Sequence, residues 1–283
     1  MSLSLTTLLL TILSMILFAA NSVLCRLALL ETGMDPASYT ALRLLSGAIM
    51  LQLIPALRGK NPLRSGNWRA ALSLFAYMAC FSWAYVELPA AAGTLIIAVA
   101  VQTTMVGAGI RLGERPRPGQ ALGIGIALAG LVFLLLPGLS APPLGSSLIM
   151  FASGAAWACY SLFGRGAGDP VAATAGNFLR CLPFAAIMVL CLHARMTISP
   201  AGVACALAAG ALASALGYII WYMIVPRFTV TTAAVVQLSV PVITAAGGVF
   251  FVGEAITPRL VLSSAAILGG IFFAMASVRR HRP

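Results

Sequence analysis

Long apolar segments follow one another along most of this chain, and short loops containing proline or glycine separate them. A bilayer hydrocarbon core is about 30 Å thick, and an α-helix needs about 20 apolar residues to cross it. The segments have this length, whereas the shorter alternating pattern of a membrane β-barrel is absent. The pattern therefore predicts an all-α polytopic membrane protein with ten transmembrane helices. They are expected near residues 5–30, 37–57, 68–87, 90–112, 119–137, 145–164, 171–193, 201–225, 230–252 and 258–278.

The composition agrees with this class of protein. Soluble domains carry roughly 25% charged residues, whereas this chain of 283 residues has 8% charged and 61% hydrophobic residues. The net charge of +11 would favour a nucleic-acid partner in a soluble protein. Here basic loops at one membrane face explain it better, so we expect membrane lipid, and no nucleic acid, as a partner. The six cysteines show no CxxC spacing and no histidine partners, so we interpret them as packing residues and predict no metal and no cofactor.

Positive residues concentrate in alternate loops. If the N-terminus lies in the cytoplasm, the outer loops hold only Arg195 and Arg259. The inner loops and the C-terminal tail then hold Arg58, Lys60, Arg64, Arg69, Arg111, Arg115, Arg117, Arg165, Arg227, Arg279, Arg280 and Arg282. Because cytoplasmic loops carry the excess of Lys and Arg, this asymmetry predicts a multi-pass protein of the bacterial inner membrane with both termini cytoplasmic.

Two stretches of the chain share one helix–loop–helix sequence pattern, and they align without a gap. Each has an apolar segment, a short loop that opens with Gly-Glu and holds a proline, and a second apolar segment containing a glycine. The matched pairs, all 140 residues apart, include Thr104 and Thr244, Gly107 and Gly247, Gly113 and Gly253, Glu114 and Glu254, Pro118 and Pro258, Leu128 and Leu268, and Gly130 and Gly270. Weaker matches extend the repeat towards the N-terminal side of each unit, with Cys25, Asp35 and Pro36 matching Cys159, Asp169 and Pro170.

The repeat divides the chain into residues 1–140 and 141–283, each with five predicted helices. Because five is odd, the second unit enters the membrane from the opposite side, which places Glu114 at the inner face and Glu254 at the outer face. We therefore predict two inverted repeats around a central cavity, related by a pseudo-two-fold axis in the membrane plane. Many membrane transporters build two gates around one site from such a duplication.

The chain resembles a known family, the EamA-type transporters of the drug/metabolite transporter superfamily. The resemblance rests on residues 217–221, Pro226, Pro241, Gly253, Glu254, Pro258, Gly269 and Gly270, and on residues 84–89, Gly113, Glu114 and Gly130 in the first unit. One departure is that Val101 stands where the first unit would carry the counterpart of Pro241. The resemblance covers essentially the full chain and implies ten helices, a central cavity and export of small metabolites, often amino acids.

Acidic residues avoid the middles of the apolar segments. All six acidic residues lie at predicted loop edges; they are Glu31, Asp35, Glu87, Glu114, Asp169 and Glu254. An ionisable group at mid-membrane would mark a proton or ion path, and the two histidines also lie at a helix end or in the tail. This argues against proton-coupled pumping through a buried carboxylate and favours facilitated export or exchange. We interpret Glu114 and Glu254 as helix-end residues, each favoured by the positive end of the helix that follows it.

Two arginines are predicted to lie well inside helices, namely Arg43 and Arg180. Exposing such a side chain to lipid costs about 3 kcal/mol or more, so each must face a partner or a watery cavity. The structural interpretation is snorkelling or pairing with a loop acid such as Asp35. The functional interpretation is capture of a substrate carboxylate by the guanidinium group. Arg26 is nearer a helix end and is expected to snorkel.

Amides and aromatic residues interrupt several of the apolar helices. Amides inside a membrane usually bond across helices, and aromatic residues near helix ends usually form the interfacial belt. In a transporter both can also line a cavity and hold an amphipathic molecule. Gln102 and Gln237 are predicted to lie deep in helices, and Trp157 and Tyr160 share a helix face. Pro183 and Pro241 are predicted to lie inside helices, where proline can form a hinge.

Several classes of function compete for this sequence. A membrane-embedded enzyme would need a catalytic cluster at mid-membrane, and none is recognisable, so we expect no enzyme. We predict a monomeric secondary transporter that exports small metabolites, amino acids foremost, by alternating access and without a buried proton-carrying carboxylate. The alternatives are a carrier of a sugar, nucleoside or drug-like compound, and a membrane-embedded enzyme. The residues expected to bind substrate are Asn21, Arg43, Tyr77, Gln102, Trp157, Tyr160, Arg180, Trp221 and Gln237.

Overall fold

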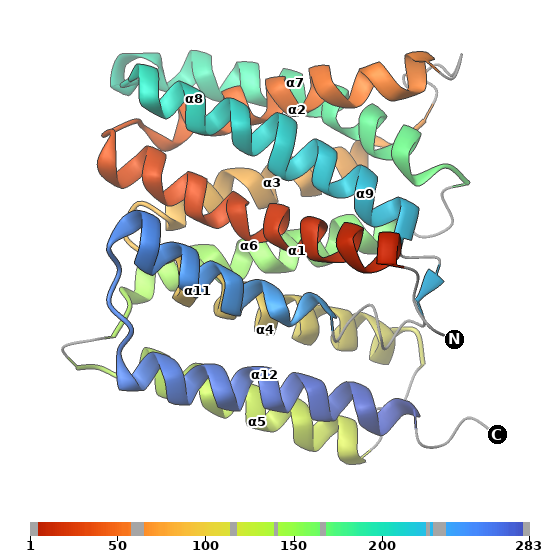
Figure 1. Cartoon of the computed structure of the whole chain (residues 1–283), viewed down its shortest axis with the longest axis vertical. Coiled ribbons are helices and arrows are strands. Elements are labelled where there is room, and N and C mark those ends of the chain that lie inside the picture. Colours follow the sequence, from red (N-terminus) through yellow and green to blue (C-terminus); the bar gives the residue numbers. More distant parts are fainter. Residues whose placement is uncertain are drawn as a thin grey trace.

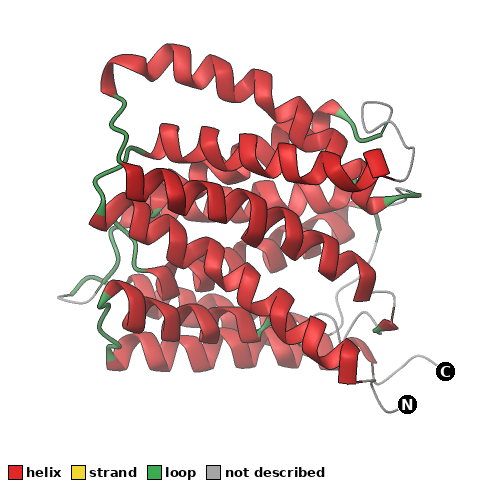
Figure 2. Ribbon diagram, turned by 45° about the horizontal axis from the view of Figure 1, so that its top comes forward, coloured by secondary structure: helices red, strands yellow, loops and turns green. Residues whose placement is uncertain are grey.

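Helices packed side by side make up the computed structural model of this protein, which describes residues 5–57, 65–113, 118–138, 141–164, 168–224, 227–228 and 236–279 (Figure 1). Every regular element in these ranges is helical (Figure 2). In chain order they are α1 (Leu5–Arg26), η1 (Leu27–Glu31), α2 (Pro36–Leu57), α3 (Trp68–Ala84), α4 (Ala90–Arg111), α5 (Pro118–Leu135), α6 (Leu144–Phe163), α7 (Pro170–Leu192), η3 (His193–Arg195), α8 (Pro200–Ala208), η4 (Ala209–Leu216), α9 (Gly217–Ile224), α11 (Ser239–Val252) and α12 (Pro258–Arg279). Elements η1 and η4 are π-helical and η3 is a 3₁₀-helix.

Proline and capping side chains set where several helices begin. A proline opens α2, α5, α7, α8 and α12, where its missing N–H has no intrahelical role to lose. Asp169 Oδ1 caps α7 by accepting from the Ala172 N–H at 3.1 Å, and Ser199 Oγ caps α8 by accepting from the Gly202 N–H at 3.1 Å. The predicted starts of these five helices are therefore correct to within one residue.

Seven of the described helices are long and apolar enough to cross a membrane. They are Leu5–Glu31, Ala90–Arg111, Pro118–Leu135, Leu144–Phe163, Pro170–Leu192, Pro200–Ile224 and Pro258–Ser277. Two other helices are shorter, with 17 residues in α3 and 14 in α11. The protein is thus an all-helical, multi-pass membrane protein, and the number of ten transmembrane helices stays a prediction. Large apolar side chains on the outside, such as Phe250 at 83% exposure, suit contact with lipid.

The helices pack in reciprocal pairs. In the predicted repeat α1 corresponds to α6 and α4 to α11, and the structure packs α1 against α11 and α6 against α4. Helix α2 packs against its counterpart α7, and α5 packs along its counterpart α12 (Figure 1). Every one of these contacts joins residues 1–140 to residues 141–283.

Glycines bring α5 and α12 into close backbone contact. A methyl group added at Gly130 would lie 3.0 Å from Ile267 Cγ1, and one added at Gly270 would lie 2.7 Å from the Ala127 backbone nitrogen. Residues 130 and 270 are equivalent in the repeat, as are residues 127 and 267. Each side of the contact is therefore built from equivalent residues of the two predicted units. Contacts across a two-fold axis have this property.

The two ends of the bundle can be told apart. The first residue of α1 and the last residue of α12 lie at one end in both views (Figures 1 and 2). The connections 32–35, 85–89, 193–199 and 253–257 lie at the other end, which we call the Glu254 end. Hydrogen bonds join these connections to one another, such as the Thr197 N–H to Asp35 Oδ2 at 2.9 Å. The inward orientation of the termini stays a prediction.

One expected helix end is wrong. Helix α3 ends at Ala84, three residues before the predicted end, because the chain turns through Tyr85 towards Pro89. Helix α11 begins at Ser239, so Pro241 lies in the first turn of this element, and Val236 and Gln237 just before it are also helical. The predicted start of this helix lies outside the described residues. The first turn has N–H groups without intrahelical acceptors, so proline costs little there. A hinge at Pro241 stays a prediction. Pro183 does lie inside α7, as predicted.

Candidate functional site

Arg43 is buried in the interior of the bundle. It lies in α2 with 0% of its side chain exposed, and its Nε donates to Ser214 Oγ at 3.2 Å. The guanidinium carbon lies 5.0 Å from the centre of the Phe81 ring and 5.9 Å from that of Tyr77. Neither Nη atom has a hydrogen-bond partner among the described residues. A buried charged donor without a partner is costly, so these two nitrogens are the chemically outstanding feature of the interior.

A short chain of hydrogen bonds holds the Arg43 guanidinium. Ser214 accepts from Arg43 and donates its own hydroxyl to Asn21 Oδ1 at 3.0 Å. Ser214 lies in η4, and π-helical turns of this kind are frequent at functional sites. These hydrogen bonds join α1, α2 and η4, so residues from both predicted units fix the direction of the two Nη atoms of Arg43.

An aromatic cluster lies beside Arg43, and we use this name for Tyr77, Phe81, Trp157, Tyr160 and Tyr218. The Trp157 ring centre lies 5.0 Å from that of Tyr77, 5.4 Å from that of Tyr160 and 5.6 Å from that of Tyr218, on which it stacks. Tyr77 also meets Phe81 edge-on at 5.6 Å. These distances are those of favourable aromatic pairs. The cluster therefore forms an apolar wall whose ring faces are attractive to cations and to other rings.

The described acids lie away from this interior site. Asp35 and Asp169 cap helices, and Glu87 accepts a hydrogen bond from Ser146. Glu31 is the last residue of η1 and is exposed, and Glu254 lies between α11 and α12. Glu114 lies outside the described residues. The site thus combines one arginine with neutral aromatic and polar side chains, which is a composition suited to an anionic group attached to an apolar body.

The structure brings together most of the residues that the sequence singled out. Asn21, Arg43, Tyr77, Trp157 and Tyr160 all lie in the aromatic cluster or in the hydrogen-bond chain beside it. Trp221 lies at the edge of this group, because its ring contacts Phe18 at 6.0 Å and Phe18 contacts Tyr218 at 5.9 Å.

The other three expected residues lie apart from the cluster. Arg180 Nη1 donates to the Ser65 carbonyl at 2.6 Å and to the Gly176 carbonyl at 2.9 Å, so its described bonds fix the segment that enters α3. Gln102 is half-buried in α4. Gln237 is exposed and lies in a helical turn just before α11.

Sequence reasoning did not include Ser214, Phe81 or Tyr218 in the expected site. Tyr218 and Phe81 each share a helix face with another aromatic residue four positions away. This spacing could have included both residues in the expected site. Ser214 is one small hydroxyl residue within an alanine-rich stretch. Nothing in the sequence distinguishes its hydrogen bond to Arg43 from the usual bond of a serine to its own helix.

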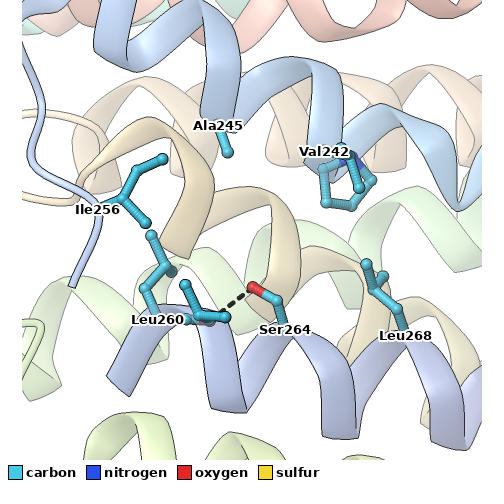
Figure 3. Close-up of a pocket in the computed structure, with 8 residues that line it drawn as sticks. Val242, Ala245, Ile256, Leu260, Ser264 and Leu268 are labelled. Atoms are coloured by element: carbon cyan, nitrogen blue, oxygen red, sulfur yellow. Dashed lines mark hydrogen bonds between the residues drawn. The ribbon is translucent and has the colours of Figure 1, made fainter. Parts of the chain in front are cut away.

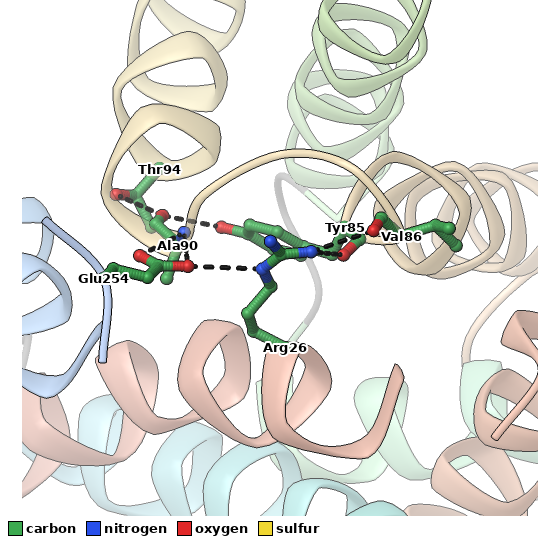
Figure 4. Close-up of polar contacts among 6 residues, drawn as sticks. All are labelled: Arg26, Tyr85, Val86, Ala90, Thr94 and Glu254. Carbon is green, nitrogen blue, oxygen red and sulfur yellow. Dashed lines mark hydrogen bonds and ion pairs between the residues drawn. The ribbon is translucent and has the colours of Figure 1, made fainter. Parts of the chain in front are cut away.

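At the Glu254 end, one carboxylate joins three parts of the chain (Figure 4). Glu254 Oε1 pairs with Arg26 Nε at 3.2 Å, and both carboxylate oxygens accept from the Ala90 N–H at 2.9 Å. Arg26 Nη1 also donates to the carbonyls of Tyr85 and Val86, each at 2.9 Å. We call this arrangement the Glu254 clasp. It ties α1 and the first turn of α4 to the α11–α12 connection, and so ties the two predicted units together.

The clasp corrects two expectations. Arg26 does not snorkel, because its side chain is only 10% exposed and is held by Glu254 and two carbonyls. Glu254 does occupy a helix end, but it caps α4 and not the helix that follows it. Pro89 precedes α4 and has no side-chain donor or acceptor to cap it, so a carboxylate from elsewhere in the chain satisfies the Ala90 N–H.

An apolar groove of about 190 Å³ lies between α11 and α12 (Figure 3). It is lined by Pro241, Val242, Ala245, Ile256, Leu260, Val261, Ser264 and Leu268. The Ser264 hydroxyl donates to the Leu260 carbonyl at 2.6 Å, so the groove presents mainly hydrocarbon. Val242 and Ile256 are exposed, and in a bilayer lipid chains would cover this face. The groove holds no group that could select a polar solute.

A multi-pass helical bundle with a polar and aromatic site in its interior suits a membrane carrier. Comparison with known families agrees with this class. Residues 5–136 and 144–276 each match the EamA-like transporter family, and the chain belongs to that family.

Similar proteins come from several bacteria. The chain is 52% identical over 272 residues to the uncharacterized protein PA1977 of Pseudomonas aeruginosa, covering 95% of this chain and 94% of that protein. It is 26% identical over 208 residues to a probable terminal-alkyne amino-acid exporter of Streptantibioticus cattleyicolor, covering 71% and 69%. It is 29% identical over 193 residues to the threonine/homoserine exporter RhtA of Escherichia coli, covering 65% and 64%.

A solved crystal structure shares the fold. It superposes with a TM-score of 0.66 at 23% sequence identity, covering 98% of this chain and 99% of that chain. The chain is thus a multi-pass member of a transporter family with bacterial relatives, which points to the inner membrane and to small molecules as substrates.

Proposed function

We propose that this protein is a secondary transporter that exports amino acids across the inner membrane. The observation that carries the proposal is the buried Arg43, whose two Nη atoms are free to bind a carboxylate beside an aromatic wall. A guanidinium group and a carboxylate match each other in a bidentate geometry. Two relatives named as amino-acid exporters support the same substrate class.

Alternating access is the mechanism that the packing supports. The reciprocal helix pairs and the self-matching contact of α5 with α12 support two inverted units, residues 1–140 and 141–283, that rock against each other. Asn21, Arg43 and Tyr77 belong to the first unit, whereas Trp157 and Ser214 belong to the second. Rocking would therefore part the walls of the site and release a substrate held between them.

The energy source in this proposal is the gradient of the substrate itself. The described acids lie at helix ends, and no carboxylate accompanies Arg43 among the described residues. A proton path through the membrane centre requires an ionisable relay. Facilitated export or exchange needs no such relay.

Reconstitution into liposomes tests the proposal. Vesicles loaded with unlabelled phenylalanine or threonine should accumulate the labelled amino acid by counterflow faster than vesicles without protein. Accumulation should persist when an ionophore removes the pH gradient. Equal rates with and without protein, for a panel of amino acids, would contradict the proposed function. Strict dependence on the pH gradient would contradict its facilitative mode alone.

Trp157→Ala should raise the KM for amino-acid counterflow about tenfold. Trp157 contacts three rings of the aromatic cluster, and an aromatic contact contributes about 0.5–1.5 kcal/mol beyond the area that it buries. Phe163→Ala is the matched control, because Phe163 lies on the same helix and is exposed. Equal KM values for the two variants would remove Trp157 from the site.

The Glu254 clasp should keep the Glu254 end closed, and Glu254→Gln should open it more often. The variant loses the charge that pairs with Arg26, and a partly buried pair that loses one partner leaves an uncompensated charge. Cys25 is fully buried next to Arg26 and can report on this opening. In a variant that retains Cys25 as its only cysteine, labelling by a membrane-impermeant maleimide should accelerate about tenfold, the equivalent of about 1.4 kcal/mol.

The control for this experiment is Glu31→Gln. Glu31 lies at the same end and is exposed, so its neutralisation should leave the labelling of Cys25 unchanged. Identical labelling rates in the parent and in Glu254→Gln would show that the clasp is not a gate.

A further inference from the structure

We propose that the site recognises its substrate by a carboxylate and an apolar body, and that an α-ammonium group is not required. The ligand class is then amphipathic monocarboxylates, in which amino acids are one group and amine-free acids another. This inference rests on the proposed function and names what the same site selects.

The carboxylate is the group for which the site is built. Arg43 is fully buried, its Nε is committed to Ser214, and its Nη1 and Nη2 are both without a partner among the described residues. Two N–H groups on one planar fork match the two oxygens of a carboxylate. Ser214 and Asn21 hold the fork in one orientation, so the donors are directed before a ligand arrives.

The described surroundings offer no matching anion for an ammonium group. The described acids lie at helix ends, and the Glu254 carboxylate is already engaged by Arg26 and Ala90. Asn21 Oδ1 is engaged by Ser214. An ammonium group bound here would meet the rings of the aromatic cluster, which compensate only in part for its lost water. It would also lie near the guanidinium of Arg43, which carries charge of the same sign.

The apolar body is set by the aromatic cluster. The Trp157 ring lies between two others, with its centre 5.0 Å from that of Tyr77 and 5.6 Å from that of Tyr218. Arg43 lies over the rings of Tyr77 and Phe81. A carboxylate on Arg43 would therefore bring the attached carbon chain directly against these rings. A short acid such as propionate would leave this wall uncovered.

Competition against labelled phenylalanine in proteoliposomes tests the inference. Three competitors lack different parts of phenylalanine: 3-phenylpropionate lacks the amine, phenethylamine lacks the carboxylate, and propionate lacks both the amine and the ring. We expect 3-phenylpropionate to inhibit counterflow within about threefold of unlabelled phenylalanine. Phenethylamine and propionate should each be at least about 30-fold weaker. Competition is preferred to direct uptake, since protonated 3-phenylpropionate crosses lipid unaided.

Binding to the purified protein separates this inference from the proposed function. 3-Phenylpropionate should raise the melting temperature of the protein in detergent, phenethylamine should not, and Arg43→Met should abolish the shift. If phenylalanine is not transported but this binding pattern holds, the proposed export of amino acids fails and the inference stands. If phenylalanine is transported and phenethylamine competes better than 3-phenylpropionate, the inference fails and the proposed function stands. Failure of 3-phenylpropionate to bind or compete in either assay overturns the inference.

Discussion

Arg43→Met is expected to lower amino-acid counterflow at least about 100-fold while leaving the folded protein at least as stable as the parent. Each hydrogen bond to a charged group contributes about 1.5–3 kcal/mol, and the variant loses both bonds to the substrate carboxylate. A loss of about 3 kcal/mol corresponds to roughly a factor of 100. The stability should not fall, because the substitution removes a buried charge whose Nη atoms have no partner among the described residues. Transport kinetics and thermal unfolding in detergent, measured on the same preparation, check both halves of this expectation.

Two further variants separate the shape of Arg43 from its charge. Arg43→Lys keeps the charge and loses the planar fork, so its transport should fall between those of the parent and of Arg43→Met. Leu45→Met changes an exposed residue on the same helix and should alter neither property. If Arg43→Met unfolds at a much lower temperature than the parent, Arg43 is a structural residue and its place in the site is wrong.

Gly123→Leu is expected to prevent α5 and α12 from packing and to lower the melting temperature by about 10 °C or more. A Cβ at this position would lie 2.5 Å from the Ala274 backbone nitrogen and 2.6 Å from the Gly270 carbonyl oxygen. These atoms are backbone, so the helices themselves must separate. Overpacking costs about 1–3 kcal/mol where side chains can adjust, and more is expected where they cannot.

Gly125→Leu is the matched control for this prediction. Gly125 lies two residues away on the same helix, is exposed and would bring its Cβ within 4 Å of nothing. The same change of residue there should leave the melting temperature within about 2 °C of the parent, because exposed substitutions have small effects. Equal destabilisation by the two variants would show that α5 does not approach α12 as described.

Most of the helices could be predicted from the sequence because two strong local signals set them. Apolar length sets the body of each helix, and Pro36, Pro118, Pro170, Pro200 and Pro258 each mark a first residue. Pro241 is less informative, because a proline in a first turn and a proline in a helix interior look alike when the start of the helix is unknown.

The candidate site was predictable in part. A buried arginine in an apolar segment has few roles open to it, so Arg43 could be singled out. Which residues surround it depends on how α2 packs against helices far along the chain. That packing explains why Arg180, which also lies well inside its own helix, instead bonds to the carbonyl of Ser65. It also explains why Ser214, which has no sequence signal, reaches Arg43.

The contact between α5 and α12 has a consequence for the ancestry of the molecule. A surface that matches itself is what a symmetric homodimer uses, so a single five-helix unit carrying this surface could have paired with a second copy of itself in the opposite orientation. Joining both copies in one chain frees them to diverge. At the position equivalent to Arg26 the second unit carries Tyr160, which has no charge to pair with a glutamate. In the proposed arrangement of two inverted units, the two mouths of the carrier would therefore differ in their chemistry.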